Sequence, residues 1–357
     1  MLRRLTSLAA LLALLALPGI VAAADAAEPE AFDPGPHVLT FTFENDLFGD
    51  TDAQYTNGMK LSYLSPDLGA LEGARGVPRW LLAAVRRINA LEDIYFPDQG
   101  REFNVGFALG QMMYTPDDTQ ATALLADDRP YAGWLYGALT LVSKNADVAD
   151  TLEIQLGMIG PASLAEDAQK LVHDIRDLPL PRGWDHQLEN EPGGVLYLER
   201  KWRLAAHEFG NGFSGDFIGH AGLALGNVYD YFAAGGEARF GWHLPRDFGT
   251  SVIRPGGDSN APAVSSAHGA RSRELGVYGF AAFGGRLVGR DIFLDGNTFA
   301  DSHDVDKKVA VGDFIIGASV VWRAAKLSYA QVFRTREFDG QRRDRHNFGS
   351  ISCSLSF

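Results

Sequence analysis

Apolar and polar residues alternate along many short segments of this chain. Segment 39–44 reads L-T-F-T-F-E, and segment 350–357, at the C-terminus, reads S-I-S-C-S-L-S-F. Successive side chains of a β-strand point to opposite faces of the sheet, so each such segment predicts a strand with one apolar and one polar face. The same alternation returns near residues 59–63, 152–158 and 237–242.

The alternating segments predict twelve strands. They lie near residues 37–46, 56–65, 102–113, 132–144, 149–160, 194–206, 209–224, 229–243, 273–286, 309–322, 325–337 and 346–357. An even number of strands of about ten residues, apolar outside and polar inside, is typical of barrels in the bacterial outer membrane. A closed barrel also satisfies every backbone polar group in lipid. We therefore predict an all-β fold, an antiparallel transmembrane β-barrel of about 12 strands with short helices in its connections.

The N-terminus has the pattern of an export signal. Two arginines, Arg3 and Arg4, precede an apolar run at 5–21, and three alanines follow at 22–24. This order is typical of a cleavable signal peptide and disfavours the alternative, a membrane anchor. We expect residues 1–24 to be the signal peptide and residues 25–357 to form a single outer-membrane β-barrel domain.

The order of strands predicts which connections face the cell exterior. Both ends of the barrel domain should be periplasmic, so the loops after odd-numbered strands face outward. Tight turns are expected at 145–148 and at Ala324. Long periplasmic connections are expected at 66–101, with an amphipathic helix at 80–91, and at 244–272, where Gly, Ser and Pro predict a flexible segment.

Composition narrows the function classes. The chain has one cysteine, Cys353, so no internal disulfide is possible. Its formal net charge of −13 argues against a nucleic-acid partner and suits a divalent cation. After the signal there is no apolar run of about 18 residues, so membrane-spanning helices are not expected.

The loop between the fifth and sixth predicted strands carries the first candidate for chemistry. Ser163 and Glu166 have the spacing of a capping box and predict a helix that begins there. Gln169 and His173 are four residues apart, so they share one face of that helix. Histidine is the natural general base near neutral pH, although a single histidine on a loop helix is most often just solvated.

The ends of the first two strands carry the second candidate. Asn45 and Asp46 end the first strand, and Thr56 begins its hairpin partner, so their oxygens should lie close together. Such residues often just form turns, but carboxylate, amide and hydroxyl oxygens are also ligands that suit Ca²⁺. A histidine base and a hard cation at one rim predict an ester hydrolase, in which the cation polarises the carbonyl. The neighbouring Glu44 and Tyr55 are candidates for contacting the substrate or supporting the site.

Two other chemistries lack their motifs. The sequence has no G-x-S-x-G segment for a serine nucleophile and no H-E-x-x-H segment for zinc. The acidic segment 301–306 lacks the spacing of an EF-hand and fits a solvated loop better.

Several ordered motifs together resemble one known family, the outer-membrane lipid A 3′-O-deacylases. The resemblance covers the mature chain and rests on F-E-N-D-L-F at 43–48, Y-T-N-G at 55–58, R-P-Y-A-G-W at 129–134, Gly160-Pro161, the segment 169–173, G-W-D-H-Q-L-E-N-E-P at 183–192, the segment 295–308, and R-E-F at 336–338 with Gln341. It implies a twelve-stranded barrel that removes the 3′-linked acyloxyacyl group of lipid A in the outer leaflet and depends on Ca²⁺.

The resemblance also implies roles for individual residues. His173 would activate the attacking water, and Gln169 would lie one helical turn before it. Asn45, Asp46 and Thr56 would serve the cation and the oxyanion. The active site would then face the extracellular side, with lipid A or lipopolysaccharide as the partner. The lysine that this family uses in the second outward loop has no counterpart in the segment 115–122.

Two alternatives remain open from sequence, together with the oligomeric state. One is an outer-membrane phospholipase-type esterase with the same base and calcium, and the other is a non-enzymatic barrel. Basic residues in the outward loops would favour the phosphates of lipid A. The candidates are Lys170, Arg176, Arg182, Arg342, Arg343 and Arg345.

Overall fold

The computed structural model describes residues 35–46, 54–68, 101–250 and 275–357. The expected signal peptide, the expected helix at 80–91 and most of the expected flexible segment at 244–272 lie outside these ranges. Within the described ranges, no helix has the length and apolar character needed to cross a membrane.

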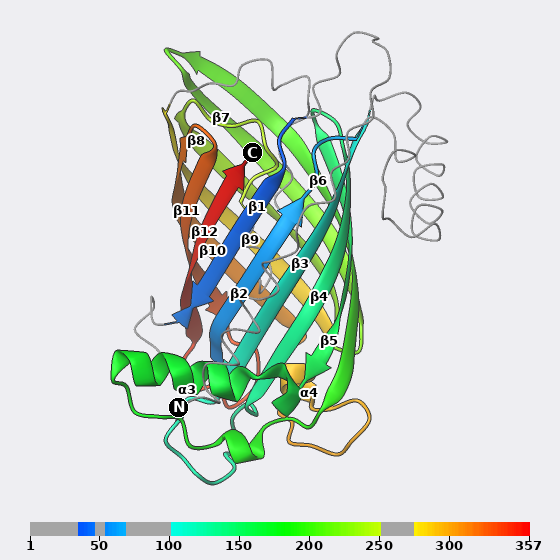
Figure 1. Cartoon of the computed structure of the whole chain (residues 1–357), viewed down its shortest axis with the longest axis vertical. Coiled ribbons are helices and arrows are strands. Elements are labelled where there is room, and N and C mark those ends of the chain that lie inside the picture. The colour runs from blue at the N-terminus through cyan, green and yellow to red at the C-terminus, as the bar shows by residue number, and fades with distance from the viewer. Residues whose placement is uncertain (1–34, 47–53, 69–100, 251–274) are drawn as a thin grey trace. The chain divides into compact units, whose positions relative to one another are not determined.

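Twelve antiparallel strands form a closed barrel in which each strand pairs with its neighbours in sequence and β1 pairs with β12 (Figure 1). The strands are β1 (Val38–Asn45), β2 (Gln54–Leu64), β3 (Glu102–Thr115), β4 (Ala132–Lys144), β5 (Val148–Ile159), β6 (Glu191–Gly210), β7 (Phe213–Gly226), β8 (Tyr229–Trp242), β9 (Leu275–Asp291), β10 (Ala310–Trp322), β11 (Ala325–Thr335) and β12 (Arg345–Ser356). The predicted barrel and its strand number are confirmed.

The C-terminal strand closes the barrel as the sequence predicts. In the register of β1 and β12, Val38 pairs with Ser356 and Asn45 pairs with Gly349. The alternation along β1 separates two faces: Phe41 is 46% exposed on the outside, whereas Thr40 and Thr42 are buried inside. An apolar outer face and a polar inner face are what a barrel in lipid requires.

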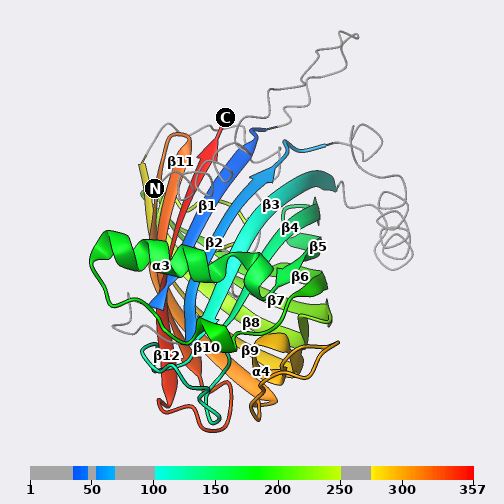
Figure 2. The ribbon, with the colours of Figure 1, turned by 60° about the horizontal axis from the view of Figure 1, so that its bottom comes forward.

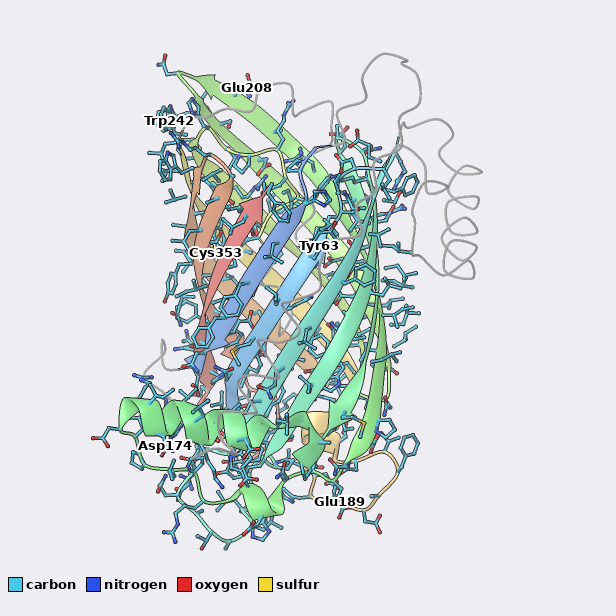
Figure 3. The ribbon with its side chains drawn as sticks, in the orientation of Figure 1. Tyr63, Asp174, Glu189, Glu208, Trp242 and Cys353 are labelled. Carbon is cyan, nitrogen blue, oxygen red and sulfur yellow. The ribbon has the colours of Figure 1, made fainter. Side chains whose placement is uncertain are left out.

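The connections distinguish the two ends of the barrel. Short turns join β4 to β5 and β10 to β11, at the end where the chain enters β1 and leaves β12, and this confirms the tight turns predicted there. We call this the terminal end and the opposite one the loop end. The loop end carries the helices α3 (Ala165–Arg176) and α4 (Ile292–Asp295) and the short 3-10 helices η3 (Pro161–Ser163) and η4 (Trp184–His186). Figure 3 marks the loop end by Asp174 and Glu189, and the terminal end by Glu208 and Trp242.

Several strands are longer than the alternation predicts. β6 begins at Glu191 and runs to Gly210, although the sequence predicts residues 194–206. Its pairing with β7 shifts register twice, between Arg203 and Ala205 and between Glu208 and Gly210. Each shift breaks the period of two, so the strand continues where the pattern no longer indicates it.

Aromatic side chains fill the lumen near the loop end. The hydroxyl groups of Tyr114 and Tyr229 form a hydrogen bond of 2.6 Å, and Phe293 of α4 stacks on the Tyr114 ring at a centroid distance of 4.2 Å. Trp134 stacks on Tyr136 in the same buried cluster. Helix α4 therefore packs into this mouth of the barrel instead of lying over it.

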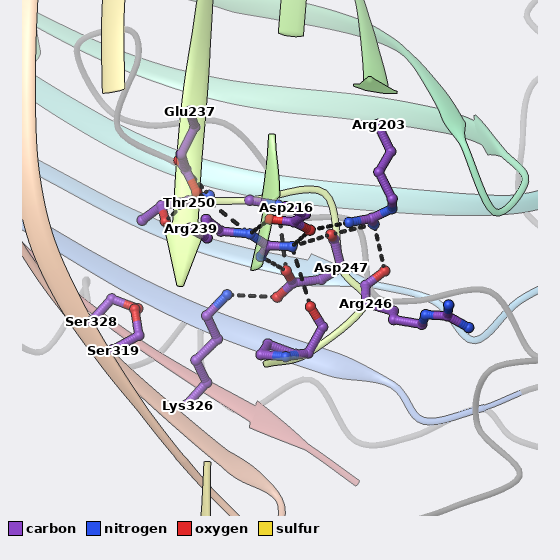
Figure 4. Close-up of polar contacts among 12 residues, drawn as sticks. Arg203, Asp216, Glu237, Arg239, Arg246, Asp247, Thr250, Ser319, Lys326 and Ser328 are labelled. Atoms are coloured by element: carbon purple, nitrogen blue, oxygen red, sulfur yellow. Dashed lines mark hydrogen bonds and ion pairs between the residues drawn. The ribbon is translucent and has the colours of Figure 1, made fainter. Parts of the chain in front are cut away.

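The segment that follows β8 occupies the lumen at the terminal end (Figure 4). Its Asp247 binds two inward-facing side chains, Arg239 of β8 and, at 2.6 Å, Lys326 of β11. Arg239 also pairs with Asp216 of β7 at 2.6 Å. Because β8 and β11 are not neighbours in the sheet, Asp247 links two separate parts of the wall across the lumen.

The predicted capping box at the start of α3 is wrong. The N-cap residue is Leu164, which has a left-handed backbone (φ 59°) and makes no side-chain cap. Ser163 belongs instead to η3, and its hydroxyl donates to the carbonyl oxygen of Gly160 at 2.6 Å. The extra 3-10 turn displaces the helix start by one residue, and Glu166 pairs with Lys170 and does not cap the helix.

Candidate active site

Helix α3 begins against the outer surface of the barrel. Phe107 and Leu109 of β3 are exposed, so Met113 lies on the same outward face by alternation, and it pairs with Gly133 of β4. Met113 packs with Ala165 of the helix. A Cβ atom on Gly133 would lie 2.2 Å from the Ala165 Cβ, which no real pair of atoms tolerates. Glycine at this position therefore lets the helix approach the wall.

From this contact, α3 runs across the outside of the barrel toward β1. Figures 1 and 2 both show the helix crossing in front of β3, β2 and β1 at the loop end. Ala165, Gln169 and His173 are the buried residues of α3 and share one helical face. Eight residues of helix advance about 12 Å, while strands are about 4.8 Å apart. The advance carries His173 two to three strands beyond the starting contact, toward β1 and β2.

The His173 side chain is held in one orientation. It is 5% exposed, and its Nδ1 lies 2.7 Å from the carbonyl oxygen of Pro179. A carbonyl oxygen only accepts hydrogen bonds, so Nδ1 of the neutral ring carries the proton. The other ring nitrogen, Nε2, then keeps its lone pair, as a general base requires.

Gln169 is fixed through its side-chain oxygen. The indole nitrogen of Trp184 donates to Gln169 Oε1 at 2.8 Å, and Trp184 itself packs against Tyr131. The amide nitrogen Nε2 of Gln169 is buried and has no hydrogen-bond partner in the structure. The Gln169 amide is therefore held in place, and its Nε2 is a hydrogen-bond donor one helical turn before His173.

Asn45 and Thr56 lie together at the end of β1 and the start of β2. The Asn45 amide donates to the Thr56 carbonyl oxygen at 3.0 Å. Asn45 shares the outward face of β1 with Phe41, yet it is only 6% exposed, so other groups cover it. The β2–β3 pairing shifts register between Tyr55 and Asn57, which leaves Thr56 as the extra residue of a bulge.

Thr115 and Asp46 are the neighbours of Thr56 and Asn45 at this end of the barrel. The hydroxyl of Thr56 lies 2.6 Å from that of Thr115, on β3. Asp46 follows Asn45 directly and is fully buried. Three oxygen-bearing side chains, those of Asn45, Asp46 and Thr56, are therefore buried at the end of one hairpin.

Glu44 and Tyr55 lie on the other side of the wall. The Tyr55 hydroxyl donates to Glu44 Oε2 at 2.6 Å, and Ser350 donates to the other carboxylate oxygen at 3.3 Å. Tyr55 is fully buried in the aromatic cluster of the lumen. From this position the two residues support Asn45 and Asp46 through the backbone of their strands, and direct substrate contact would require a path through the wall.

The donor set suits a hard cation by its chemistry. Asn45, Asp46 and Thr56 offer only oxygen, which Ca²⁺ prefers. Within the ranges that the structure describes, there is no cluster of three or more His, Cys, Asp or Glu side chains for a metal. The residues present therefore fit a calcium ion held by one carboxylate and neutral oxygens, and they do not fit a zinc centre.

The other motifs singled out in the sequence pair with one another near the same end of the barrel. Arg129 binds Glu337 at 3.1 Å, and its guanidinium lies over the Phe338 ring at 5.5 Å. Glu191 accepts from the backbone nitrogen of Thr298 at 2.7 Å. These contacts tie distant segments into one rim, so the motifs mark a structural frame around the candidate site.

Sequence reasoning missed three contributors to the site. The carbonyl of Pro179 orients His173, Trp184 orients Gln169, and Thr115 meets Thr56. Trp184 could be suspected from its motif, but a backbone carbonyl leaves no signal in the sequence. Thr115 becomes a neighbour of Thr56 only through the register of β2 and β3.

The architecture has a counterpart among solved structures. The LpxR of Salmonella typhimurium has a similar structure, with a TM-score of 0.67 and 18% sequence identity over 90% of this chain and 100% of that chain. The β domain of the Bordetella autotransporter BrkA has a TM-score of 0.41 and 12% identity over 91% of this chain and 100% of that chain. No curated protein sequence matches. The family model described as outer membrane protein LpxR matches residues 8–357, and the chain therefore belongs to the LpxR family of outer-membrane lipid A 3′-O-deacylases.

Proposed function

We propose that the chain hydrolyses the 3′-linked acyl ester of lipid A with His173 as the general base. The observation that carries the proposal is the Nδ1 contact of His173 with Pro179, which leaves Nε2 as the basic nitrogen on the face of α3 that is turned to the barrel wall. The buried side chains of Asn45, Asp46 and Thr56 lie at the end of the first hairpin, toward which α3 runs, and would supply the cation site beside that base.

The proposed reaction is a direct hydrolysis. His173 Nε2 takes a proton from a water molecule, whose oxygen forms a bond to the ester carbonyl carbon. The bond from that carbon to the 3′ oxygen of the sugar then breaks. The imidazolium returns its proton to the 3′ oxygen, and the products are a sugar hydroxyl and a free fatty acid.

Negative charge on the carbonyl oxygen needs stabilisation during this reaction. The unpartnered Nε2 of Gln169 is a donor held close to the base by Trp184. Asp46, with the side-chain oxygens of Asn45 and Thr56, would hold Ca²⁺, which when bound supplies positive charge to polarise the ester carbonyl.

We further propose that the site faces the cell exterior. The LpxR family places the barrel in the outer membrane, and lipid A fills the outer leaflet of that membrane. The candidate residues lie at the loop end and on the outer flank of the wall, so an ester could approach sideways from the leaflet. Exposed Arg176 and Arg182, near α3, are suited to the phosphates of lipid A.

The side chains that fill both ends of the lumen argue against a pore. At the loop end the aromatic cluster and α4 occupy the mouth, and at the terminal end Asp247 and its partners do. A phospholipase-type esterase would use the same base and cation, so the substrate has to be decided by experiment.

Mass spectrometry of lipid A from cells that express the protein tests the proposal. The wild type should remove the 3′ acyl chains, and His173→Ala should leave them in place. His186→Ala is the matched control, because His186 lies in the same loop and its ring nitrogen also contacts a carbonyl oxygen, that of Thr122 at 3.1 Å. Full activity of His173→Ala would refute the assigned base, and fatty-acid release from phospholipids alone would favour the phospholipase alternative.

A further inference from the structure

Helix α3 has three distinct faces. A helix that packs on a barrel wall is expected to have a buried face and a charged face, and α3 has an exposed apolar face in addition. The buried face carries Ala165, Gln169 and His173. With 100° between successive residues, Arg176 falls between Val172 and Gln169, whereas the other four charged side chains gather on a second face. They are Glu166, Asp167, Lys170 and Asp174.

The third face of α3 is apolar and exposed. Leu171 is 45% exposed, Val172 is 40% exposed and Ile175 is 75% exposed. These three positions fall within about 100° of the helical wheel, on the side of the buried face that is opposite to the charged residues. We name Leu171, Val172 and Ile175 the apolar stripe of α3. Exposed side chains of this size that gather on one face mark an interaction surface.

The apolar stripe continues the outer surface of the barrel. On β1, toward which the helix runs, Phe41 is 46% exposed, and on β3, where the helix begins, Phe107 is 52% exposed and Leu109 is 37% exposed. Met113, which packs under the first turn of α3, lies four residues beyond Leu109 on the same outward face, about 13 Å further along the strand. The helix is therefore attached to the wall beyond the last exposed apolar side chain on this face of β3, that of Leu109.

The geometry points to the hydrocarbon of the outer leaflet as the partner of this stripe. We propose that Leu171, Val172 and Ile175 insert between acyl chains at the membrane surface, while the charged face of α3 remains in water. An amphipathic helix with one apolar and one charged side adopts this position at a membrane interface. A second copy of the chain is the competing occupant, but the continuity with the lipid-facing wall favours lipid.

Insertion would set the depth of the candidate site. Val172 and His173 project about 100° apart on the helix, so the base would lie on the face next to the one that enters the hydrocarbon. The ester linkages of a lipid lie at the boundary between headgroup and acyl chains. This consequence rests on the proposed function, whereas the insertion itself rests only on the structure of α3 and on the membrane location of the family.

Quenching by brominated lipids tests the insertion without any measurement of activity. An environment-sensitive fluorophore is attached to Ile175→Cys or to Asp174→Cys, each in a Cys353→Ser background, and the protein is reconstituted in phosphatidylcholine vesicles. Native Cys353, which is exposed on β12, provides a label on the lipid-facing wall as a positive control (Figure 3).

The expected result is several-fold quenching by brominated acyl chains at positions 175 and 353 and little quenching at position 174. Equal quenching at 174 and 175, or none at 175, would overturn the proposal. Disulfide-linked dimers through position 175 without quenching would assign the stripe to a second copy. These quenching outcomes do not depend on whether His173→Ala keeps or loses activity. The proposed insertion and the proposed function can therefore fail separately.

Discussion

The ring nitrogen Nδ1 of His173 lies 2.7 Å from the carbonyl oxygen of Pro179, six residues further along the chain. The turn between them makes this contact possible. Asp177 ends α3 with a left-handed backbone (φ 55°), and the Leu178 nitrogen donates back to the His173 carbonyl at 2.9 Å. The orientation of the proposed base thus depends on one turn outside the helix.

The turn predicts a matched pair of variants at Asp177. Asp177→Val should lower kcat, because a β-branched residue resists the left-handed region by about 1–2 kcal/mol and would shift the Pro179 carbonyl. Asp177→Gly should keep most of the activity, because glycine accepts that backbone. Steady-state assays on purified protein check both, and equal rates for the two variants would mean that the turn does not position His173.

A second pair of variants tests whether α3 must lie against the wall. Gly133→Val should displace the start of the helix, since even a Cβ would lie 2.1 Å from Ser163 Oγ, and we expect a large loss of activity in a folded barrel. Gly137→Val, four residues along the same face of β4, should be tolerated, because its Cβ would meet only the Ala108 carbonyl at 4.0 Å. Folding is checked by the heat-dependent mobility of the barrel on SDS gels. If Gly133→Val is as active as wild type, α3 does not need this contact.

The oxygen donors at the end of the first hairpin predict a calcium requirement. Removing calcium with a chelator should stop hydrolysis, and added Ca²⁺ should restore it. Asp46→Asn removes the only carboxylate of the three proposed ligands, so its half-maximal calcium concentration should rise at least about tenfold. Calcium titrations of the reaction and of calcium binding to the protein measure this shift. An unchanged calcium dependence would exclude Asp46 as a ligand.

The buried Glu337 predicts acid sensitivity. Burial alone would raise the pKa of Glu337, but Arg334, Arg129 and Arg286 outweigh it and lower the pKa from 4.5 to about 2. A lowered pKa in the folded state stabilises the protein fully above about pH 4.5, and this contribution is lost as the pH falls toward 2.

Two variants separate this contribution from general surface charge. Glu337→Gln should cost about 3–5 kcal/mol at neutral pH, as for a buried pair that loses one partner. The difference from wild type should shrink between pH 4.5 and 2, in denaturant titrations followed by tryptophan fluorescence. Asp339→Asn breaks only the exposed pair with Lys308 and should change stability by less than about 1 kcal/mol. A constant difference at all pH values would argue against the network around Glu337.

The link across the lumen predicts a change in ion conductance. Asp247→Ala removes the shared partner of Arg239 and Lys326, so the segment after β8 should leave the lumen more often. In planar bilayers the variant should show channel openings that the wild type lacks. Asp147→Asn, in the exposed turn at the same end of the barrel, is the control and should remain closed. A variant as silent as the wild type would mean that Asp247 is not needed to close the lumen.

The sequence was sufficient to predict the barrel, because the alternation of apolar and polar residues and the even number of such segments both reflect the requirement of a sheet closed in lipid. The ends of the strands were harder to predict. At Thr56 and in β6, bulges interrupt the period of two, and a bulge has no pattern of its own.

The sequence indicates which residues are candidates for the site but not how they are arranged. The spacing of Gln169 and His173 predicts their shared face, but not that the face turns toward the outer wall. That depends on the fit of Ala165 against Met113 and Gly133, which joins segments far apart in sequence. By contrast, strand alternation already places the side chains of Glu44 and Asn45 on opposite sides of the wall, so this part of the arrangement follows from the sequence.

The packed interior of the barrel has a consequence for the cell. In a membrane enzyme whose reactive groups line a channel, a lumen that is open enough to admit substrate also lets ions pass. Here the proposed base lies on the flank, and the interior is filled by side chains that pack and pair with one another. Substitutions on the flank that adapt the site to a different lipid would therefore leave the side chains that fill the lumen, and the barrier to ions, unchanged.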